Sequence, residues 1–110
     1  MLASKFHPLR ELRIRVVRSF LDIIILLILR KKPSSGYDIF RCLVNAGIVM
    51  SPGTIYDTLH LLERKGYIEG IWDSRKKIYS LTRRGEEYLK AFLAEKESIL
   101  EVMNEILVKA

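Results

Sequence analysis

Residues 51–66 read SPGTIYDTLHLLERKG and carry the clearest helix signals in the 110-residue chain. Ser51 is a favourable N-cap residue, because its hydroxyl can accept a backbone N–H of the first turn. Pro52 suits the first helical position, where the missing N–H removes no hydrogen bond. Gly66 is a typical residue just beyond a helix end. The stretch therefore predicts a helix that begins after Ser51 and ends near residue 65.

This helix has one apolar and one polar face. At roughly 100° per residue, Ile55, Leu59 and Leu62 fall on one side and predict contact with a core. The opposite side and its flanks present small, polar and charged residues: Gly53, Thr54, Tyr56, Asp57, His60 and Arg64. An ordinary solvated face has the same composition, so the pattern by itself assigns no partner.

The residues before this helix predict further helices. Residues 9–32 contain no Pro or Gly, and they end in a basic run that suits the negative end of a helix dipole. Pro33 stops the helix, so the stretch predicts one long helix or two in succession. Its part at 20–29, FLDIIILLIL, has about half the length needed to span a bilayer. We expect this part to be a helix buried on all sides.

The rest of the chain predicts one more helix, a hairpin and a long final helix. Residues 34–36 (SSG) can cap a helix that we expect to end at Gly47. The apolar period then changes, because residues 67–72 and 77–81 are rich in β-branched and aromatic residues and flank a polar turn. They predict a β-hairpin. Thr82 is a suitable N-cap for the last helix.

This order of elements is typical of a winged helix, a helix-turn-helix followed by a two-stranded wing. We therefore expect a mainly α (α+β) fold, a winged helix-turn-helix with a two-stranded β-hairpin wing and a long C-terminal helix. The length allows one compact domain. Within it we expect an N-terminal helical extension at residues 1–18, the winged helix at 19–85 and the last helix at 86–110.

The composition narrows the classes of function. The net charge of +6 favours a polyanionic partner, and the basic residues are concentrated in 1–33 and 67–85. Cys42 is the only cysteine, which fits a cytoplasmic location and predicts a small buried side chain on a helix. The two histidines have no partners at the spacing of a zinc site or a catalytic triad. We expect no cofactor, no metal, no membrane partner and no enzymatic activity.

Four stretches resemble the PadR-like transcriptional regulators, a family named for a regulator of phenolic acid decarboxylase. They are SSGYDI at 34–39, SPGTIYDTL at 51–59, LLERKGYI at 61–68 and KIYSLTRRG at 77–85. The resemblance implies a winged-helix dimer whose third helix enters the major groove of DNA and whose wing reaches the neighbouring backbone. The C-terminal helix would supply the dimer contact. Asp57 stands where the family often has proline, and it suits DNA only if it accepts from a cytosine amino group.

In this arrangement we expect the third helix to contact DNA. The helix N-terminus at Ser51 and Gly53 favours a phosphate. Thr54 and His60 can reach base edges, and Tyr56 can donate its hydroxyl to a phosphate. The full predicted DNA-binding set is Tyr37, Ser51, Gly53, Thr54, Tyr56, Asp57, His60, Arg64, Arg75, Lys76 and Lys77.

Several of these residues have a structural alternative. Arg75, Lys76 and Lys77 form a basic wing tip, which we expect to meet the DNA backbone or the minor groove rather than to serve only solubility. Tyr37 begins the second helix, where a phosphate contact and a place in the core are equally compatible. Trp72 lies on a strand and predicts core or hairpin packing, with stacking on a ligand as the less favoured alternative.

The last helix carries an apolar stripe that extends beyond what a small domain can cover. Such a stripe predicts a contact with a second copy of the chain, because large exposed apolar patches are rare on monomers. The expected dimer residues are Leu89, Phe92, Lys96, Ile99, Leu100, Met103, Ile106 and Leu107, joined by Leu9, Leu12 and Val16 of the first helix.

We therefore expect a homodimeric, sequence-specific regulator of transcription that binds a pseudo-palindromic site in double-stranded DNA, and we expect it to repress. The alternative is a winged-helix module that binds another protein within a larger assembly, since the charge of residues 34–66 is balanced. The sequence identifies no residues for a small-molecule effector.

Overall fold

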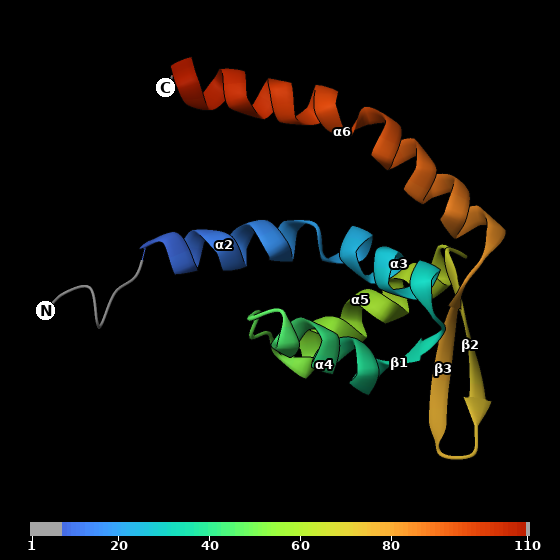
Figure 1. Cartoon of the computed structure of the whole chain (residues 1–110). Helices are drawn as coiled ribbons and strands as arrows, with labels where there is room; N and C mark the ends of the chain where they lie inside the picture. Colours follow the sequence, from blue (N-terminus) through green and yellow to red (C-terminus); the bar gives the residue numbers. More distant parts are fainter. Residues whose placement is uncertain (1–7, 110) are drawn as a thin grey trace, which may run out of the picture.

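The computed structural model describes the backbone of residues 8–109 and, except at Leu12 and Arg13, the side chains of residues 11–106. Along the chain the elements are α2 (Pro8–Ser19), α3 (Leu21–Lys31), β1 (Ser34–Ser35), α4 (Gly36–Asn45), α5 (Pro52–Arg64), β2 (Ile68–Asp73), β3 (Lys76–Leu81) and α6 (Arg83–Lys109). Figure 1 shows α3, α4 and α5 packed together, with the hairpin β2–β3 at one end and α6 above. The predicted fold class, a mainly helical winged helix with a long C-terminal helix, is confirmed.

The core lies between α3, α4, α5 and the start of α6. Ile55 and Leu59 of α5 are 0 % exposed and Leu62 is 2 % exposed, so the predicted apolar face of this helix is confirmed. Burial of each such side chain stabilises the fold by about 1.5–3 kcal/mol. The other side chains that are fully enclosed are Ile25, Leu26, Ile39 and Leu89.

Helix α3 is only partly buried. Ile25 and Leu26 are enclosed, whereas Ile24, Leu27 and Ile28 are half-buried and pack at the margin of the core. The expectation of a helix buried on all sides is therefore wrong on one face, because a domain with few elements cannot surround a helix. None of the helices in the described residues is long and apolar enough to cross a membrane.

The first helical stretch divides in two at Phe20. The backbone of Phe20 has φ −112° and ψ 19°, outside the helical region, so α2 and α3 follow in succession. Its ring packs against Phe92 of α6, with the ring centroids 5.9 Å apart. This contact holds the break in the helix against the long C-terminal helix.

The predicted helix caps are present. The Ser35 hydroxyl accepts the backbone N–H of Asp38 at 3.1 Å, and the Asp38 carboxylate accepts that of Ser35 at 3.2 Å, which forms a capping box at the start of α4. At the start of α5 the Ser51 side chain accepts the backbone N–H of Thr54. The Thr82 hydroxyl accepts the backbone N–H of Gly85 at 3.1 Å and so begins α6.

The sheet has three antiparallel strands in the order β1-β3-β2, one more than predicted. The additional strand contains only Ser34 and Ser35, which pair with Tyr79 and Ile78 of β3. Two residues are too few to show the alternation that identifies a strand, so the sequence predicted none here. This short strand connects the wing directly to the start of α4.

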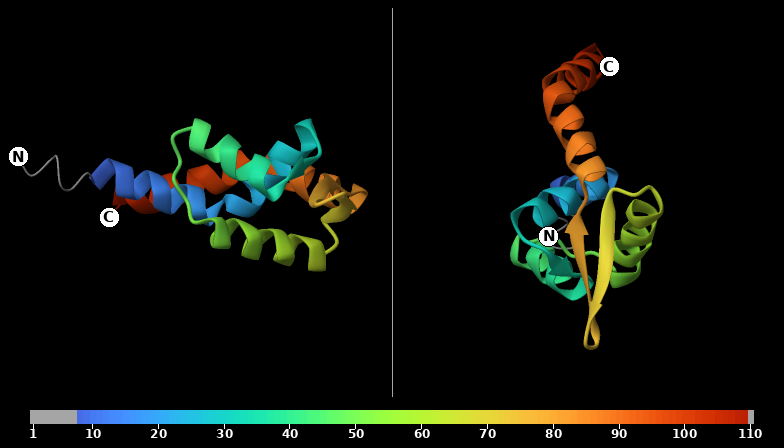
Figure 2. Two further views of the ribbon diagram at one scale, coloured as in Figure 1. Left: turned by 90° about the horizontal axis from the view of Figure 1, so that it is seen from below. Right: turned by 90° about the vertical axis from the view of Figure 1, so that its right-hand side faces the viewer.

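Helix α6 starts on the core and then leaves it (Figure 1, Figure 2). Phe92 is half-buried against the core of its own chain, and Leu89 is completely buried there. Leu89 therefore cannot contribute to a dimer surface, which corrects that expectation. Farther along the helix Ile99 is half-buried, and the exposed members of the predicted set are Lys96, Leu100, Met103 and Ile106.

The predicted dimer residues on the first helix are less fully described. Val16 is exposed on α2. Leu9 and Leu12 lie on the backbone of α2 and Leu107 on that of α6, but their side chains lie outside the described part of the chain.

Cys42 lies on α4 and is exposed, not buried as expected. Helix α4 turns Ile39 and Leu43 toward the core, and a residue three positions after Ile39 falls on its margin. A small apolar side chain was expected inside, but the helix period places it outside.

We predict that Leu59→Asp unfolds the domain. An unpaired carboxylate in the core costs several kcal/mol, which is comparable to the whole stability of a small domain. His60→Asp is the matched control, because His60 is exposed on the opposite face of α5 and should melt close to the wild type. Thermal unfolding followed by circular dichroism measures both. A Leu59→Asp variant with wild-type melting would show that the buried face is assigned wrongly.

Candidate nucleic-acid interface

The outer face of α5 is open to solvent. Asp57, His60 and Arg64 are exposed and, together with Glu63, line a hollow of about 690 Å³. Because the opposite face is held in the core, these side chains project away from the domain. The face combines hydrogen-bond donors and acceptors, as the reading of base edges requires.

The N-terminus of α5 is accessible as well. The Ser51 hydroxyl accepts the backbone N–H of Thr54 at 3.4 Å, so the predicted cap is in place. Gly53 is exposed, and a Cβ added to it would meet no atom closer than the Ser51 hydroxyl at 3.4 Å. Neither space nor a positive φ within this chain demands a glycine there.

A groove of about 380 Å³ connects α5 with the wing. It is lined by Ser35, Gly36, Tyr37, Tyr56, Trp72, Arg75, Lys76, Lys77 and Tyr79. The groove brings together predicted residues from three separate elements, α4, α5 and the hairpin. Figure 1 shows the hairpin extending past α4 and α5 on this side of the molecule.

Two tyrosines form one wall of the groove. The Tyr56 ring lies on Gly36, where an added Cβ would be 2.5 Å from a ring carbon, so any side chain at residue 36 would displace the ring. Tyr37 is 56 % exposed, which decides against a place in the core. Its hydroxyl accepts a hydrogen bond from Arg41 at 3.1 Å, and the Arg41 guanidinium lies 5.9 Å from the ring centre. Arg41 is a cation beside the predicted set that the sequence did not single out.

Trp72 forms part of the opposite wall and is 68 % exposed. The expectation of core or hairpin packing is wrong for this residue. Trp72 pairs with Lys77 across the hairpin, near the tip, where no third layer covers the sheet. An exposed aromatic ring that lines a groove with basic residues suits contact with a sugar or a base.

Lys77 differs from the two other basic residues of the wing. Its ammonium donates to the Glu63 carboxylate of α5 at 3.1 Å, and both side chains are half-buried. The bond with Glu63 raises the pKa of Lys77, so the ammonium stays charged at neutral pH. Gly70 lies beneath the lysine, and an added Cβ would collide with its side chain. The missing side chain at Gly70 thus lets Lys77 cross the hairpin and tie the wing to α5.

Arg75 and Lys76 remain as the outer cations of the wing. Both are exposed, and neither forms an ion pair with a side chain of the described residues. The three residues that the sequence grouped together therefore have two different environments.

A comparison with known protein families gives a match that covers the helices and the wing described above. The family model described as "Transcriptional regulator PadR-like family" matches residues 25–91, more than half of the chain. The chain belongs to the PadR-like family of transcriptional regulators. It is thus a DNA-binding transcription regulator. No match was found among curated protein sequences.

Solved structures of two PadR family regulators and of a further transcriptional regulator have a similar architecture. A PadR family transcription regulator from Clostridium difficile is 31 % identical, with a TM-score of 0.71 over 80 % of this chain and 98 % of that one. A transcriptional regulator from Clostridium thermocellum is 29 % identical, with a TM-score of 0.73 over 83 % and 93 %. A PadR family regulator from Eggerthella lenta is 23 % identical and supports the fold over 97 % of each chain, with a TM-score of 0.81.

We predict that Lys77 contributes nothing to the salt dependence of DNA binding, because its charge is already paired with Glu63. Lys77→Met should weaken binding but leave the slope of log K against log [salt] unchanged. Arg75→Ala and Lys76→Ala should each reduce the slope, by about 0.9 for every phosphate that the variant no longer neutralises. Fluorescence anisotropy on one labelled duplex at several salt concentrations measures all three. An equal fall in slope for Lys77→Met would show that Lys77 itself contacts a phosphate.

Proposed function

We propose that this PadR-like protein is a homodimeric repressor that binds a pseudo-palindromic site in double-stranded DNA. In each chain α5 enters the major groove, and the wing contacts the adjacent backbone or minor groove. Repression follows from occupancy, since a dimer seated on promoter DNA excludes other proteins from the same base pairs.

The observation that carries the proposal is the groove between α5 and the wing. Its walls hold the hydroxyls of Tyr37 and Tyr56 and the charges of Arg75 and Lys76. A DNA strand whose phosphates run along this groove would meet donors on both sides. The outer face of α5 would then reach into the major groove next to that strand.

Different residues of α5 have different roles in this arrangement. Ser51 and Gly53 offer the helix N-terminus to a phosphate. Thr54 and His60 read base edges, and Asp57 accepts from a cytosine amino group. Arg64, near the C-terminal end of the helix, lies on the same exposed face and contacts a phosphate.

The dimer contact belongs to the outer part of α6. Leu100, Met103 and Ile106 are exposed there, on a helix that has left its own core (Figure 2). A helix seam with a second copy would cover these side chains. A twofold axis through this seam places two α5 helices about one DNA turn, roughly 34 Å, apart.

Selection from random duplexes, followed by sequencing, tests the proposed function. The expected result is an enriched pseudo-palindrome with half-sites about one helical turn apart. Enrichment of a single, asymmetric half-site would contradict the dimer geometry. No binding to any duplex at low salt would favour the protein-interaction module instead.

Gly53→Ala separates the role of the helix N-terminus in binding from any role in folding. The chain has room for the methyl group, and Ala is a better helix former than Gly, so the melting temperature should stay the same or rise slightly. The methyl group would stand between the helix and the DNA, so affinity should fall about tenfold, equivalent to about 1.4 kcal/mol. Circular dichroism and anisotropy measure the two quantities. Unchanged affinity would remove the N-terminus of α5 from the interface.

We also predict that the wild type sediments at about 26 kDa, twice the 12.8 kDa chain. Ile99→Glu/Met103→Glu should sediment as a monomer, because four carboxylates would meet in the seam. Ala94→Glu/Ser98→Glu is the matched control, since it adds the same charge to exposed positions on the opposite face of α6. A monomeric wild type at micromolar concentration, or a monomeric control, would contradict this seam.

A further inference from the structure

The outer face of α4 carries two side chains, Tyr37 and Arg41, of which the proposed function uses only the first. They are four positions apart, which is about one turn and roughly 6 Å along the helix axis. Both side chains are exposed. Ile39 and Leu43 form the core side of α4, so the pair lies on the side that faces away from the core.

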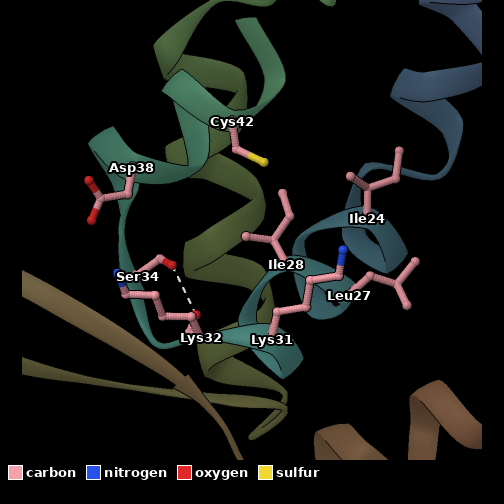
Figure 3. Close-up of a pocket in the computed structure, with 8 residues that line it drawn as sticks. All are labelled: Ile24, Leu27, Ile28, Lys31, Lys32, Ser34, Asp38 and Cys42. Carbon is pink, nitrogen blue, oxygen red and sulfur yellow. Dashed lines mark hydrogen bonds between the residues drawn. The ribbon is translucent and has the colours of Figure 1, made fainter. Parts of the chain in front are cut away.

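Another side of α4 faces α3. Figure 3 shows the groove between these two helices, the α3–α4 groove, which has a volume of about 340 Å³. The Cys42 sulfur points from α4 across this groove toward Ile28 of α3. Tyr37, in contrast, lines the groove between α5 and the wing. The pair is therefore directed toward the proposed DNA surface and not toward α3.

Arg41 has an acid at a favourable helical spacing but does not pair with it. Asp38 lies three positions earlier on α4, a separation that commonly gives an ion pair. Its carboxylate instead accepts the backbone N–H of Ser35 at 3.2 Å, which holds it at the start of the helix (Figure 3). This bond is the main reason why the pKa of Asp38 is lowered, and the charges of Lys76 and Lys32 add to the effect. The capping box thus keeps the nearest carboxylate from Arg41.

The partner of Arg41 is a neutral group. Its Nη1 donates to the Tyr37 hydroxyl oxygen at 3.1 Å, and its guanidinium carbon lies 5.9 Å from the centre of the Tyr37 ring. Arg41 forms no ion pair with any side chain that the structure describes. Its positive charge is therefore not neutralised within the chain, and most of its N–H groups remain available as donors.

The bond to Arg41 leaves the Tyr37 hydroxyl able to donate. The hydroxyl oxygen accepts from the guanidinium, so its own hydrogen can be donated to another group. A cation that donates to the oxygen also polarises the O–H bond and strengthens the hydrogen bond that the hydroxyl makes. One exposed helical turn thus presents a phenol donor and a guanidinium donor side by side. An anion with several acceptor oxygens can accept from both.

The surroundings of the pair favour phosphate as that anion. The groove that Tyr37 lines also contains Arg75 and Lys76 of the wing. In Figure 1, α4 and the tip of the hairpin lie on the same side of the molecule, opposite α6. Cations that extend from the wing to Arg41 match a strand with a negative charge on every nucleotide better than they match a single carboxylate.

We propose that Tyr37 and Arg41 together bind one phosphate of the DNA backbone, beyond the groove between α5 and the wing. Tyr37 donates its hydroxyl to one phosphate oxygen and positions the guanidinium, and Arg41 donates N–H groups to the same phosphate and neutralises its charge. The inference rests on the DNA binding of the proposed function and extends the contact surface by one turn along α4. Arg41 is therefore a phosphate-binding residue, and Tyr37 is also its positioning residue.

Fluorescence anisotropy on one labelled duplex at several salt concentrations tests these two roles. Arg41→Ala should weaken binding about tenfold. It should also reduce the slope of log K against log [salt] by about 0.9 for every phosphate that the variant no longer neutralises. Arg41→Lys should retain the wild-type slope but bind more weakly, because an ammonium lacks the planar set of donors. An unchanged slope for Arg41→Ala would overturn the proposal.

Tyr37→Phe separates position from charge. The variant keeps the cation and the ring, so binding should weaken several-fold while the slope stays that of the wild type. Combined with Arg41→Ala, it should cost less than the sum of the two separate losses, because both substitutions act on one contact. Fully additive losses would show two independent contacts and would overturn the shared phosphate.

Arg83→Ala is the matched control. Arg83 is likewise an exposed arginine with a partner four positions later, Glu87, but it lies at the start of α6, away from the tip of the hairpin. It should bind DNA with the affinity and slope of the wild type. An equal fall in slope would show that the slope follows net charge alone and would overturn the proposal. Circular dichroism should give wild-type melting for all variants, since exposed pairs of this kind add little to stability.

Ethylation interference on the same duplex locates the phosphate. Ethylation of at least one backbone phosphate should weaken binding of the wild type but not weaken binding of Arg41→Ala any further. Identical interference patterns for the two proteins would overturn this contact and leave the proposed function intact. Failure of the wild type to bind any duplex would contradict both.

Discussion

The burial of one face of α5 is the constraint on which the rest of the structure depends. Ile55, Leu59 and Leu62 fix the rotation of this helix about its own axis, because any other rotation would bring apolar side chains into water or charged ones into the core. The outer face, with Asp57, His60 and Arg64, is thereby directed away from the domain. In the proposed DNA complex, the orientation of α5 would thus be a consequence of core packing, and the residues proposed to read DNA could differ without loss of stability.

The position of the wing depends on a second set of contacts. Strand β1 joins β3 to the start of α4, and the Lys77–Glu63 ion pair joins β3 to α5. Two glycines make these close approaches possible, since Gly36 accommodates the Tyr56 ring and Gly70 accommodates the Lys77 side chain. The wing is therefore attached to both α4 and α5, while Arg75 and Lys76 at its tip stay exposed. This division explains why neighbouring basic residues of one hairpin have different environments.

Helix α6 and the α3–α4 groove expose apolar surface for different reasons. The outer half of α6 extends beyond the small core, and Leu100, Met103 and Ile106 are exposed there. The groove exposes part of Ile24, Leu27 and Ile28, which form a face of α3 that the core leaves half-buried. Exposed apolar surface of both kinds is costly in water. The first suits a long helix of a second copy.

Local signals in the sequence determined the helices, their caps and the hairpin. Ser35, Ser51 and Thr82 cap the expected helices, and the period of α5 identified its buried face, because caps and periodicity depend on neighbours within a few residues. Only the tertiary structure decided which charged side chains form ion pairs, which glycines lie beneath another side chain and which helix faces are exposed to solvent. Lys77 and Arg75 look alike in the sequence, but of these two only Lys77 forms an ion pair among the described residues. Cys42, Trp72 and Leu89 each differ from their expected exposure. These outcomes depend on contacts between residues far apart in the chain, whose distances no local pattern contains.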